Sequence, residues 1–376
     1  MAKKEDIIEY MDTNVYEQAL KRVEKIYNSH DEVWVNFSGG KDSLVMLKLV
    51  EEYHEINGYS DKINVIFRDE EMINTFVRDF VLTFVDNPKY NFKYYTTQLV
   101  SEIFVLGAKR KYIQWDENRR WVIDKPECGI TEKGVYDQYN FNQLVFDKRN
   151  KRVCNLVGIR ADESLMRYSG ISKSRIPYLT KDPTLKNGTI GKPIYDWSEK
   201  DIFKYLHDKE IDYCQIYDMQ IFNKESLRVA TILHAEASRN LYKVKTLDPI
   251  LYNQVVDIFP DIELQARYHK DIAKSGKERI IKAFKEKSGG DPWGAILLYI
   301  EENLTDPTQK RKALHRVYSA KKTRDRKKLT PENPFGGYPA HYIFNKIIGG
   351  GYKRPIQPIS DAKDIYFEYE NRSLRA

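Results

Sequence analysis

The stretch Ser38–Ser43 reads Ser-Gly-Gly-Lys-Asp-Ser and brings hydroxyl, ammonium and carboxylate groups together. An apolar run precedes it and an apolar-periodic segment follows it, so we predict a strand, a tight turn and a helix start. Gly39 and Gly40 let the backbone turn sharply and approach a ligand closely. The amides and the dipole of the helix start favour an anion, and Lys41 adds a positive charge. With the Ser38 and Ser43 hydroxyls as donors, the stretch predicts a site for phosphate or pyrophosphate.

The elements around this stretch alternate between strand and helix patterns. We predict helices over 14–27, 42–53 and 75–85, and strands over 33–37, 63–67, 91–96 and 155–159. Such alternation is typical of an α/β fold with a Rossmann-like parallel sheet and helices on both faces. Because ligands of such sheets bind at the carboxyl ends of the strands, we expect Ser38–Ser43 and the acidic turn 69–71 along one rim.

The spacing of the glycines excludes the Walker-type phosphate loop, in which four residues separate them. Ser38–Ser43 instead resembles the signature of the PP-loop superfamily. That superfamily includes the N-type ATP pyrophosphatases, the small subunits of ATP sulfurylase and the phosphoadenylylsulfate (PAPS) reductases. The resemblance implies an adenine nucleotide alpha-hydrolase-like fold. It also implies that the nucleotide phosphates are bound by Ser38, Gly39, Gly40, Lys41 and Ser43.

A second motif, Val157-Gly158-Ile159-Arg160, ends a predicted strand and continues to Arg167. It resembles the Gly-Ile-Arg-x-x-x-Ser segment of PAPS reductases and their relatives, which implies that Gly158 and Arg160 bind the nucleotide. Guanidinium groups bind phosphate or sulfate through two parallel hydrogen bonds, so Arg160 and Arg167 suit such a ligand. The alternative is that both arginines pair with Asp162, Glu163 or other surface acids.

A third motif, Lys192–Ser198, reads Lys-Pro-Ile-Tyr-Asp-Trp-Ser and resembles another segment of this family. We expect Trp197 to pack in the core, and Asp196 or Ser198 to cap the helix that follows. A tyrosine-containing turn of the family has its counterpart here in 216–219, with Arg228 beyond it.

The order of these motifs over residues 32–235 resembles one branch of the superfamily in particular. This branch comprises PAPS-reductase-like proteins related to immunoglobulin-binding regulator A, which share a tryptophan-containing insertion and a long helical tail. The resemblance implies a ParB-like protein as a partner.

The resemblance also implies chemistry at the α-phosphate of ATP, by pyrophosphatase action or adenylyl transfer. Lys41 and Arg160 would stabilise charge in the transition state, and Mg²⁺ would neutralise the pyrophosphate leaving group. Asp42 would either hold Mg²⁺ or merely cap the helix, and both alternatives stay open. Asp69 is expected to contact the ribose or adenine, with Glu71 as the second choice and a solvated acidic turn as the alternative.

PAPS reduction is the competing reaction, and it needs a nucleophilic cysteine. In PAPS reductases this cysteine lies near the C-terminus in a Glu-Cys-Gly-x-His context, whereas Glu127-Cys128-Gly129-Ile130 lies in mid-chain and Thr131 stands in place of histidine. We therefore favour ATP chemistry, with Cys128 as an ordinary loop cysteine or, alternatively, the thiol of a PAPS or APS reductase. The cysteines form no CxxC pair and the histidines show no zinc-site spacing, so we expect neither an iron–sulfur cluster nor zinc.

With 376 residues, of which 41% are hydrophobic, the chain can form one large domain or two ordinary ones. We predict a nucleotide-binding domain over 1–245, in which an insertion of helices and loops at 99–150 covers the site, and a mainly helical region over 246–376. No apolar run approaches the roughly 18 residues of a membrane span, and the first residues lack a signal-peptide pattern. We therefore expect no membrane contact, and the few cysteines indicate a reducing cytoplasm.

Positive charge is concentrated in one segment, 310–328. There ten residues are Lys or Arg and one, Asp325, is acidic, which gives +9 where the whole chain carries +7. The segment predicts contact with nucleic acid or another acidic partner, or else a solvated helix face. A non-catalytic subunit that senses nucleotide or binds nucleic acid is therefore a further functional hypothesis.

Overall fold

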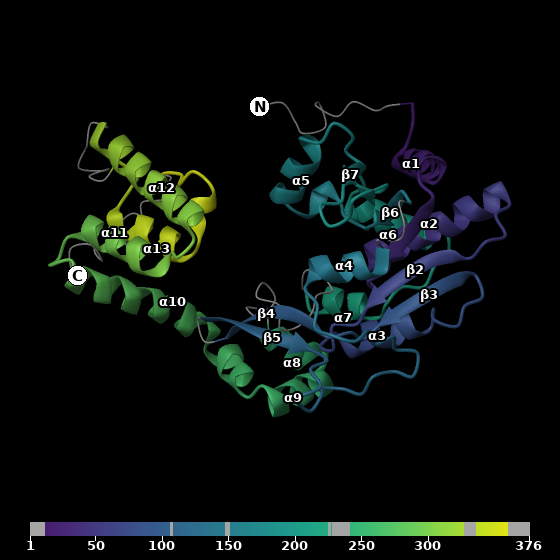
Figure 1. The fold of residues 1–376 in the computed structure, drawn as a ribbon, viewed down its shortest axis with the longest axis horizontal. Helices are drawn as coiled ribbons and strands as arrows, with labels where there is room; N and C mark the ends of the chain where they lie inside the picture. Colours follow the sequence, from purple (N-terminus) through teal and green to yellow (C-terminus); the bar gives the residue numbers. More distant parts are fainter. Residues whose placement is uncertain are drawn as a thin grey trace. The chain divides into compact units, whose positions relative to one another are not determined.

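The computed structural model describes residues 12–105, 108–146, 151–224, 227, 241–326 and 336–359. The chain divides into two compact units, Met1–Arg267 and Tyr268–Ala376. The first unit contains both β-sheets, and the described part of the second is helical (Figure 1).

A six-stranded sheet with the order β3-β2-β1-β6-β8-β7 forms the centre of the first unit. Its strands are β1 (Glu32–Asn36), β2 (Ile63–Arg68), β3 (Tyr90–Tyr95), β6 (Val153–Leu156), β7 (Leu179–Lys181) and β8 (Gly188–Gly191). All neighbouring strands pair in parallel except β7, which runs antiparallel to β8 at one edge. The register places Val35 beside Val65 on one side and Leu156 on the other. The predicted Rossmann-like sheet is confirmed.

Alternate strand residues face two separate apolar layers, because successive side chains of a strand point to opposite sides. Val33 and Val35 of β1 belong to the larger layer. The helices of that layer are α1 (Val15–Ser29), α2 (Lys41–Asn57), α3 (Thr75–Leu82), α6 (Glu199–Asp208) and α7 (Ile216–Phe222). On the other face, Trp34 and Ile66 pack with Phe141 of α4 (Gln138–Phe146). Helices thus cover both faces, as the alternating pattern predicted.

The insertion after β3 contains a β-hairpin that the sequence analysis missed. Strands β4 (Leu99–Val105) and β5 (Ala108–Gln114) pair antiparallel along their whole length, from Leu99 beside Gln114 to Val105 beside Ala108. The prediction of helices and loops was wrong for this part, because cross-strand pairing stabilises these residues and is invisible in local composition. Only two residues separate the strands in sequence, which is a typical hairpin spacing.

Two helices at the predicted domain boundary of 245/246, one spanning it and one following it, belong to the first unit. These are α8 (Leu241–Leu247) and α9 (Pro249–Ile258). Leu251 and Val255 of α9 share a buried cluster with Met72 and Val122, so their packing extends the first unit to Arg267. The short elements after β6 are the 3₁₀ turn η2 (Ala161–Glu163) and α5 (Leu165–Ser172).

The second unit begins within α10 (Asp261–Lys287). Its other elements are α11 (Pro292–Asn303), α12 (Pro307–Arg326), α13 (Ala340–Ile348) and the 3₁₀ turn η4 (Gly351–Lys353). A core around Ile296, Val317 and Phe344 joins them. Over the described residues, none of the helices combines the length and the apolar character that crossing a membrane requires.

Candidate active site

The loops after β1 and β6 meet at the point where the strand order of the sheet reverses. From β1 the chain proceeds outward through β2 and β3, whereas β6 and β8 continue on the other side. Ligands of doubly wound sheets bind at the carboxyl ends of the strands at such a point. Gly158, after β6, contacts the backbone after β1 so closely that a Cβ atom there would lie 2.7 Å from the carbonyl carbon of Asp42. Gly158 thus acts by permitting this contact.

Two glycines shape the loop between β1 and α2. Gly39 has a φ of +72°, which disfavours other residues, and a Cβ atom there would lie 2.7 Å from Val81 and 2.8 Å from Val77 of α3. Gly40 precedes α2 at its N-cap position and, without a side chain, makes no cap hydrogen bond. The Lys41 amide at the helix start bonds to Tyr217, so an anion would bind the other amides of the loop and first turn.

The two serines of the loop bond to each other and to the backbone. The Ser43 hydroxyl accepts a hydrogen bond from the Ser38 amide at 3.1 Å and donates one to the Gly40 carbonyl at 2.9 Å. The two hydroxyl oxygens lie 3.0 Å apart. These bonds fix the loop, and they place Ser38 and Ser43 next to the helix start, where they were predicted to bind phosphate.

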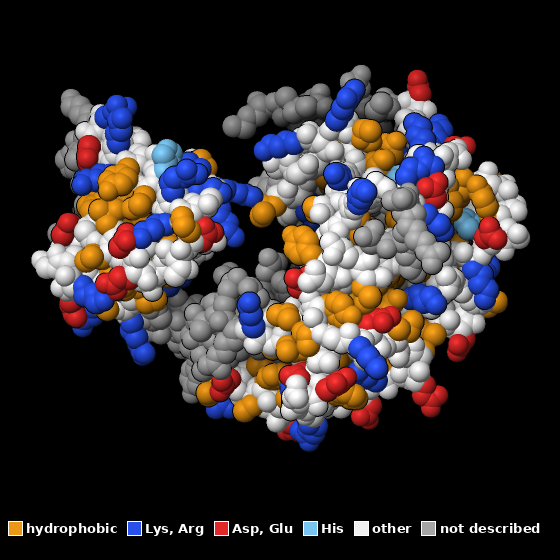
Figure 2. All heavy atoms as spheres, in the orientation of Figure 1, with side chains coloured by type: hydrophobic (Ala, Val, Ile, Leu, Met, Phe, Trp, Pro, Cys, Tyr) orange, Lys and Arg blue, Asp and Glu red, His pale blue; other side chains and the backbone are white. Residues whose placement is uncertain are grey.

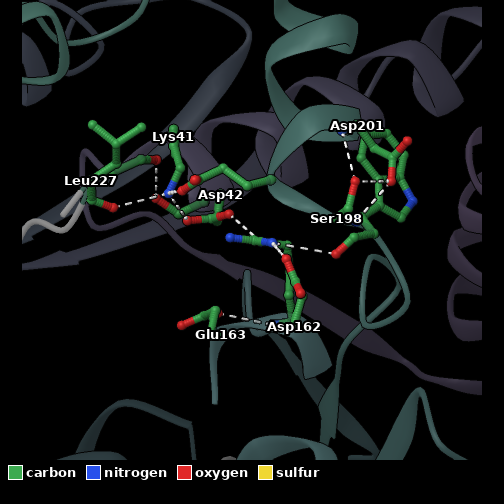
Figure 3. Close-up of polar contacts among 12 residues, drawn as sticks. Lys41, Asp42, Asp162, Glu163, Ser198, Asp201 and Leu227 are labelled. Carbon is green, nitrogen blue, oxygen red and sulfur yellow. Dashed lines mark hydrogen bonds and ion pairs between the residues drawn. The ribbon is translucent and has the colours of Figure 1, made fainter. Parts of the chain in front are cut away.

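Lys41 is buried although it carries a charge, and polar groups surround its ammonium group. Its side chain is only 3% exposed, and its Nζ lies 3.1 Å from Asp42 Oδ2 and 3.4 Å from Glu199 Oε1. The same Nζ donates to the Leu227 carbonyl at 3.2 Å, as Figure 3 shows. Its backbone amide donates to the hydroxyl of the buried Tyr217 at 2.9 Å. These contacts hold the ammonium group in one place at the start of α2.

Arg160 approaches the same carboxylate from the opposite side. Its side chain is also 3% exposed, and its Nε donates to Asp42 Oδ1 at 2.5 Å. Its Nη1 donates to the Trp197 carbonyl at 3.3 Å and lies 3.5 Å from Asp162. Asp42, 21% exposed, therefore bridges the two buried cations with one oxygen each. The predicted catalytic residues Lys41, Asp42 and Arg160 come together in one cluster.

Arg167 does not join this cluster directly. It lies on α5, its side chain is 43% exposed, and it forms an ion pair with Glu163 four residues earlier. Pairing with surface acids was the alternative considered for both arginines. It describes Arg167, whereas Arg160 combines such a contact, to Asp162, with the bond to Asp42.

The turn after β2 is buried, so the interpretation of Asp69 and Glu71 as a solvated acidic turn was wrong. Asp69 is fully buried, and its carboxylate accepts from the Tyr94 hydroxyl at 2.5 Å and from the Glu71 amide at 2.8 Å. Arg78 lies 3.1 Å from it. Burial raises the pKa of the Asp69 carboxyl, and Arg78 and Tyr94 offset this only in part. With these partners, the carboxylate fixes the turn.

Glu71 is held still more tightly, in a left-handed conformation with a φ of 65°. Arg119 donates to both of its oxygens, at 2.7 and 2.6 Å, and the amides of Trp115 and Val122 donate to it as well. Glu71 thereby anchors the segment after β5 to the rim of the sheet. Sequence analysis missed Arg119, because nothing in the spacing of the two residues indicates that they meet.

The third motif, Lys192–Ser198, contacts the site through its backbone and caps the next helix. Ser198 caps α6 and forms a capping box with Asp201, which confirms one of the two predicted caps (Figure 3). Asp196 instead pairs with Arg22 of α1. Trp197 packs in the core as predicted, and its carbonyl accepts from Arg160. Sequence analysis singled out the turn containing Tyr217 but not its bond to Lys41; Arg228 lies outside the described residues.

The three cysteines lie in the described part of the chain, Cys128 partly buried and Cys154 and Cys214 buried. Burial raises the pKa of the Cys128 thiol, and it raises those of Cys154 and Cys214 to about 11. Thiolate is the nucleophilic form, so these surroundings disfavour reactivity. Within the same residues, no three His, Cys, Asp or Glu side chains are grouped as metal ligands.

A groove of about 670 Å³ lies at the other end of the sheet. Glu32, Val33, Trp34 and Asn64, which line it, belong to the first residues of β1 and β2. The groove is therefore separate from the cluster around Asp42, which follows the carboxyl end of β1.

Residues 32–223 match the phosphoadenosine phosphosulfate reductase domain family. The chain belongs to this family. The matched region contains all three motifs and the whole six-stranded sheet. Its fold is that of the adenine nucleotide alpha-hydrolases of the PP-loop superfamily.

Two curated relatives are proteins named as uncharacterized. YbdN of Escherichia coli K12 is 28% identical over 211 residues, which is 51% of this chain and 51% of that protein. MJ0973 of Methanocaldococcus jannaschii is 26% identical over 264 residues, which is 69% of this chain and 55% of that protein. The chain spans about half the length of the curated relatives it matches.

The similarity to solved structures is more distant. The FMN adenylyltransferase of Candida glabrata, in complex with FMN and an ATP analogue, is 13% identical, with a TM-score of 0.36 over 56% of this chain and 63% of that one. The PAPS reductase of Candida auris, in a phosphate complex, is 11% identical, with a TM-score of 0.31 over 56% of this chain and 93% of that one.

Proposed function

We propose that this chain is a PP-loop enzyme that binds an adenine nucleotide and acts at its α-phosphate, as an ATP pyrophosphatase or adenylyl transferase. The observation that carries the proposal is the pair of buried cations, Lys41 and Arg160, held on Asp42 at the start of α2. Burial of two cations costs free energy unless anions accompany them. The phosphates of a nucleotide would supply further anionic oxygens at this point.

The reaction would begin with attack of a nucleophile on the α-phosphorus. The bond from that phosphorus to the bridging oxygen breaks, and pyrophosphate leaves with the electron pair. We assign binding of the leaving group to the amides of Gly39 and Gly40 and to Ser38 and Ser43, at the N-terminus of α2. Lys41 and Arg160 would stabilise the charge that develops on the phosphate oxygens.

Mg²⁺ is part of this proposal, with Asp42 as its protein ligand. Such ions are commonly bound by one or two carboxylates together with substrate phosphates. Asp42 fits this role because it is the carboxylate nearest the helix start, but each of its oxygens already contacts a cation. It would therefore hold Mg²⁺ through water or by exchange with Lys41. Bound there, the ion would neutralise the leaving pyrophosphate.

The contacts of Asp69 favour a supporting role over a direct one. Its carboxylate is enclosed and already bonded to Tyr94, Arg78 and the Glu71 amide. We propose that Asp69 shapes the rim against which the ribose or adenine lies, and that Arg167 lies at the outer edge of the phosphate site.

The experiment is a nucleotide panel with two readouts, binding by calorimetry and pyrophosphate release. ATP with Mg²⁺ should bind and release pyrophosphate, and Lys41→Ala should reduce release by at least about 100-fold, the usual effect of losing one transition-state contact. Lys62→Ala, an exposed lysine before β2, is the matched control and should leave both readouts unchanged. ATP binding that is equal in wild type and Lys41→Ala would refute the assignment of the site.

Sulfonucleotide reduction is the second candidate, and the placement of Cys128 is the observation in its favour. Ile130, two residues after Cys128, pairs with Tyr95 at the carboxyl end of β3. Cys128 therefore lies near the carboxyl ends of the strands, as Asp42 does. Binding of PAPS or APS but not ATP, with thiol-dependent release of sulfite that Cys128→Ser abolishes, would establish it. Silence with every nucleotide would favour a regulatory subunit.

The narrower assignments stay proposals of the same kind. We propose membership of the branch related to immunoglobulin-binding regulator A, a ParB-like partner and a cytoplasmic location. Each rests on the motifs and on the sparse cysteines. Copurification of a ParB-like protein with the full chain from its native cells would test the partner.

A further inference from the structure

We propose that one side of α12, in the second unit, binds the phosphate backbone of a nucleic acid. The residues concerned are Arg311, Lys312, Lys322 and Arg326, which we call the basic face of α12. All four are exposed. Figure 2 shows Lys and Arg side chains along the course of this helix. The inference does not depend on the nucleotide chemistry proposed for the first unit.

The periodicity of the helix separates this side from the core. Arg311, Lys322 and Arg326 are 11 and 4 residues apart, so they lie on one side of the helix. The buried residues Ala313, Val317 and Ala320 form the other side and pack in the core of the second unit. The helix is thus fixed by its apolar side, and its basic side faces outward.

The cations of α12 fall into two groups. Lys310 pairs with Glu301, Arg324 pairs with Asp325, and Lys321 and Arg324 lie over the Trp293 ring at 5.8 and 4.8 Å. These contacts belong to the fold. Across the part of the chain that the structure describes, no carboxylate pairs with the basic face of α12. Four like charges without counter-charges repel one another, and a polyanion would relieve that repulsion.

The dimensions suit a nucleic acid. From Arg311 to Arg326 the helix rises about 22 Å, and a duplex carries roughly 13 phosphate charges over that length. Long Lys and Arg side chains can each select a phosphate within reach, without a fixed register. Tyr318, 56% exposed, lies on the same side between Arg311 and Lys322. Its ring could stack on an unpaired base.

Two other polyanions fit less well. A helix that lies on an anionic membrane inserts an apolar side, but the apolar side of α12 is buried within its own unit. A protein interface needs an apolar centre with specific partners, whereas the basic face of α12 carries repeated charges around a single aromatic ring. Several cations without an apolar centre are the complement of a phosphate backbone.

The test measures binding of the full chain to fluorescein-labelled nucleic acid by fluorescence anisotropy, over a series of KCl concentrations. The probes are a DNA duplex of about 25 base pairs, which exceeds the length of the basic face, the matching RNA duplex and each single strand. The variant replaces Arg311, Lys312, Lys322 and Arg326 by Glu. The control variant replaces the exposed first-unit residues Lys21, Lys25, Lys181 and Lys186 by Glu, so that the net charge changes equally.

We expect the α12 variant to lose affinity on the order of 100-fold and its salt slope to fall by about 3, since each phosphate contact contributes nearly 1 to that slope. The control variant should keep both values within about threefold. Tyr318→Ala should weaken single strands more than duplexes. ATP turnover should be unchanged in the α12 variant, and nucleic-acid binding unchanged in Lys41→Ala, so that the two proposals fail independently.

Three outcomes would overturn the inference. The first is wild-type chain that binds none of the probes at low salt, and the second is an equal loss of affinity in both charge variants. The third is tighter, α12-dependent binding to phosphatidylserine vesicles or to polyglutamate than to any nucleic acid. Circular dichroism spectra and melting temperatures of both variants must match wild type, and single substitutions Arg311→Glu and Lys322→Glu replace the full variant if it does not fold.

Discussion

Two groups of positively charged side chains in this molecule have opposite surroundings, one buried and one exposed. Lys41 and Arg160 are 3% exposed and share the carboxylate of Asp42, whereas the basic face of α12 is exposed and has no described carboxylate partner. Buried cations are held in fixed directions and are screened little by salt. Exposed ones move freely and are screened strongly. The first arrangement suits one small anion in one orientation, and the second suits a long anion in many registers.

The two groups of cations are also held in place by different interactions. At the carboxyl ends of β1 and β6, close contact between two backbone segments brings Asp42 to Arg160, because Gly158 has no side chain that would keep the two loops apart. On α12, apolar packing of the opposite side holds the helix, and the charges follow from its periodicity. Substitutions at the first group should therefore disturb folding and chemistry together, whereas those at the second should disturb binding alone.

The largest effect is expected for Gly158→Ala. A Cβ atom there would lie 2.7 to 2.8 Å from the backbone of Asp42 and Ser43, which cannot move away without displacing the start of α2. Overpacking of this kind costs about 1 to 3 kcal/mol, and a displacement near 1 Å at a reacting centre costs about 100-fold in rate. Urea unfolding and pyrophosphate release would measure the two losses.

Gly170→Ala is the matched control on α5. Nothing lies within 4 Å of the position of its Cβ atom, and the residue is helical. Alanine favours helix over glycine by up to about 1 kcal/mol, so this variant should be as stable as wild type or slightly more stable. Equal stability and activity in the two variants would refute the view that contact between the loops orders the site.

Asp42→Asn tests the bridging role of the carboxylate. The variant keeps the size of the side chain but leaves Lys41 and Arg160, both nearly buried, without the anion they share. Loss of one partner of a buried pair costs 3–5 kcal/mol. Because Asp42 is 21% exposed, we expect about 2 kcal/mol, measured by urea unfolding. Pyrophosphate, which would replace the missing charge, should raise the melting temperature of the variant more than that of wild type.

The control for this prediction comes from α12. Asp325 pairs with Arg324, but its side chain is half exposed, and exposed pairs contribute at most about 1 kcal/mol. Asp325→Asn should therefore change the free energy of unfolding by less than about 0.5 kcal/mol. A similar loss in both variants would contradict the distinction between the two groups of cations.

Features that depend on residues close together in the sequence were predicted, whereas features that depend on residues far apart in the sequence were missed. The Ser38–Ser43 loop and the cap at Ser198 depend on neighbouring residues, and both were predicted from spacing alone. The hairpin of β4 and β5, and the bond between Glu71 and Arg119, depend on residues brought together by the fold. Arg160 lies between these cases: its motif marked it as a site residue, but the structure was needed to place it on Asp42.

Gly158 shows what a motif does not reveal about backbone packing. Its motif predicts a nucleotide contact, which stays a prediction, and the structure adds a close contact between two backbone segments of the chain itself. A residue without a side chain leaves no chemical signature in the sequence that would distinguish these roles. The two compact units divide at Arg267/Tyr268, whereas the sequence predicts a boundary at 245/246, and the buried cluster that contains Leu251 and Met72 links distant parts of the sequence.

The smallest effect is expected at Cys128. Burial raises the pKa of this thiol above its ordinary value, so the thiolate fraction near neutral pH is lower than for a free cysteine. Alkylation by iodoacetamide should therefore be slow at pH 7 and should accelerate as the pH rises toward the raised pKa. Cys154 and Cys214, with pKa values raised to about 11, should react more slowly still. Peptide mass spectrometry would measure the three rates within one sample.

Turnover of ATP should be the same in Cys128→Ser and wild type if the site acts at the α-phosphate, because no thiol takes part in that reaction. Cys214→Ser serves as the comparison, since it removes a buried thiol of the core near α7. Fast alkylation of Cys128 at pH 7 that PAPS prevents would reverse the argument. Cys128 would then be a reactive thiol that the sulfonucleotide shields, and reduction would replace adenylyl chemistry as the proposed function.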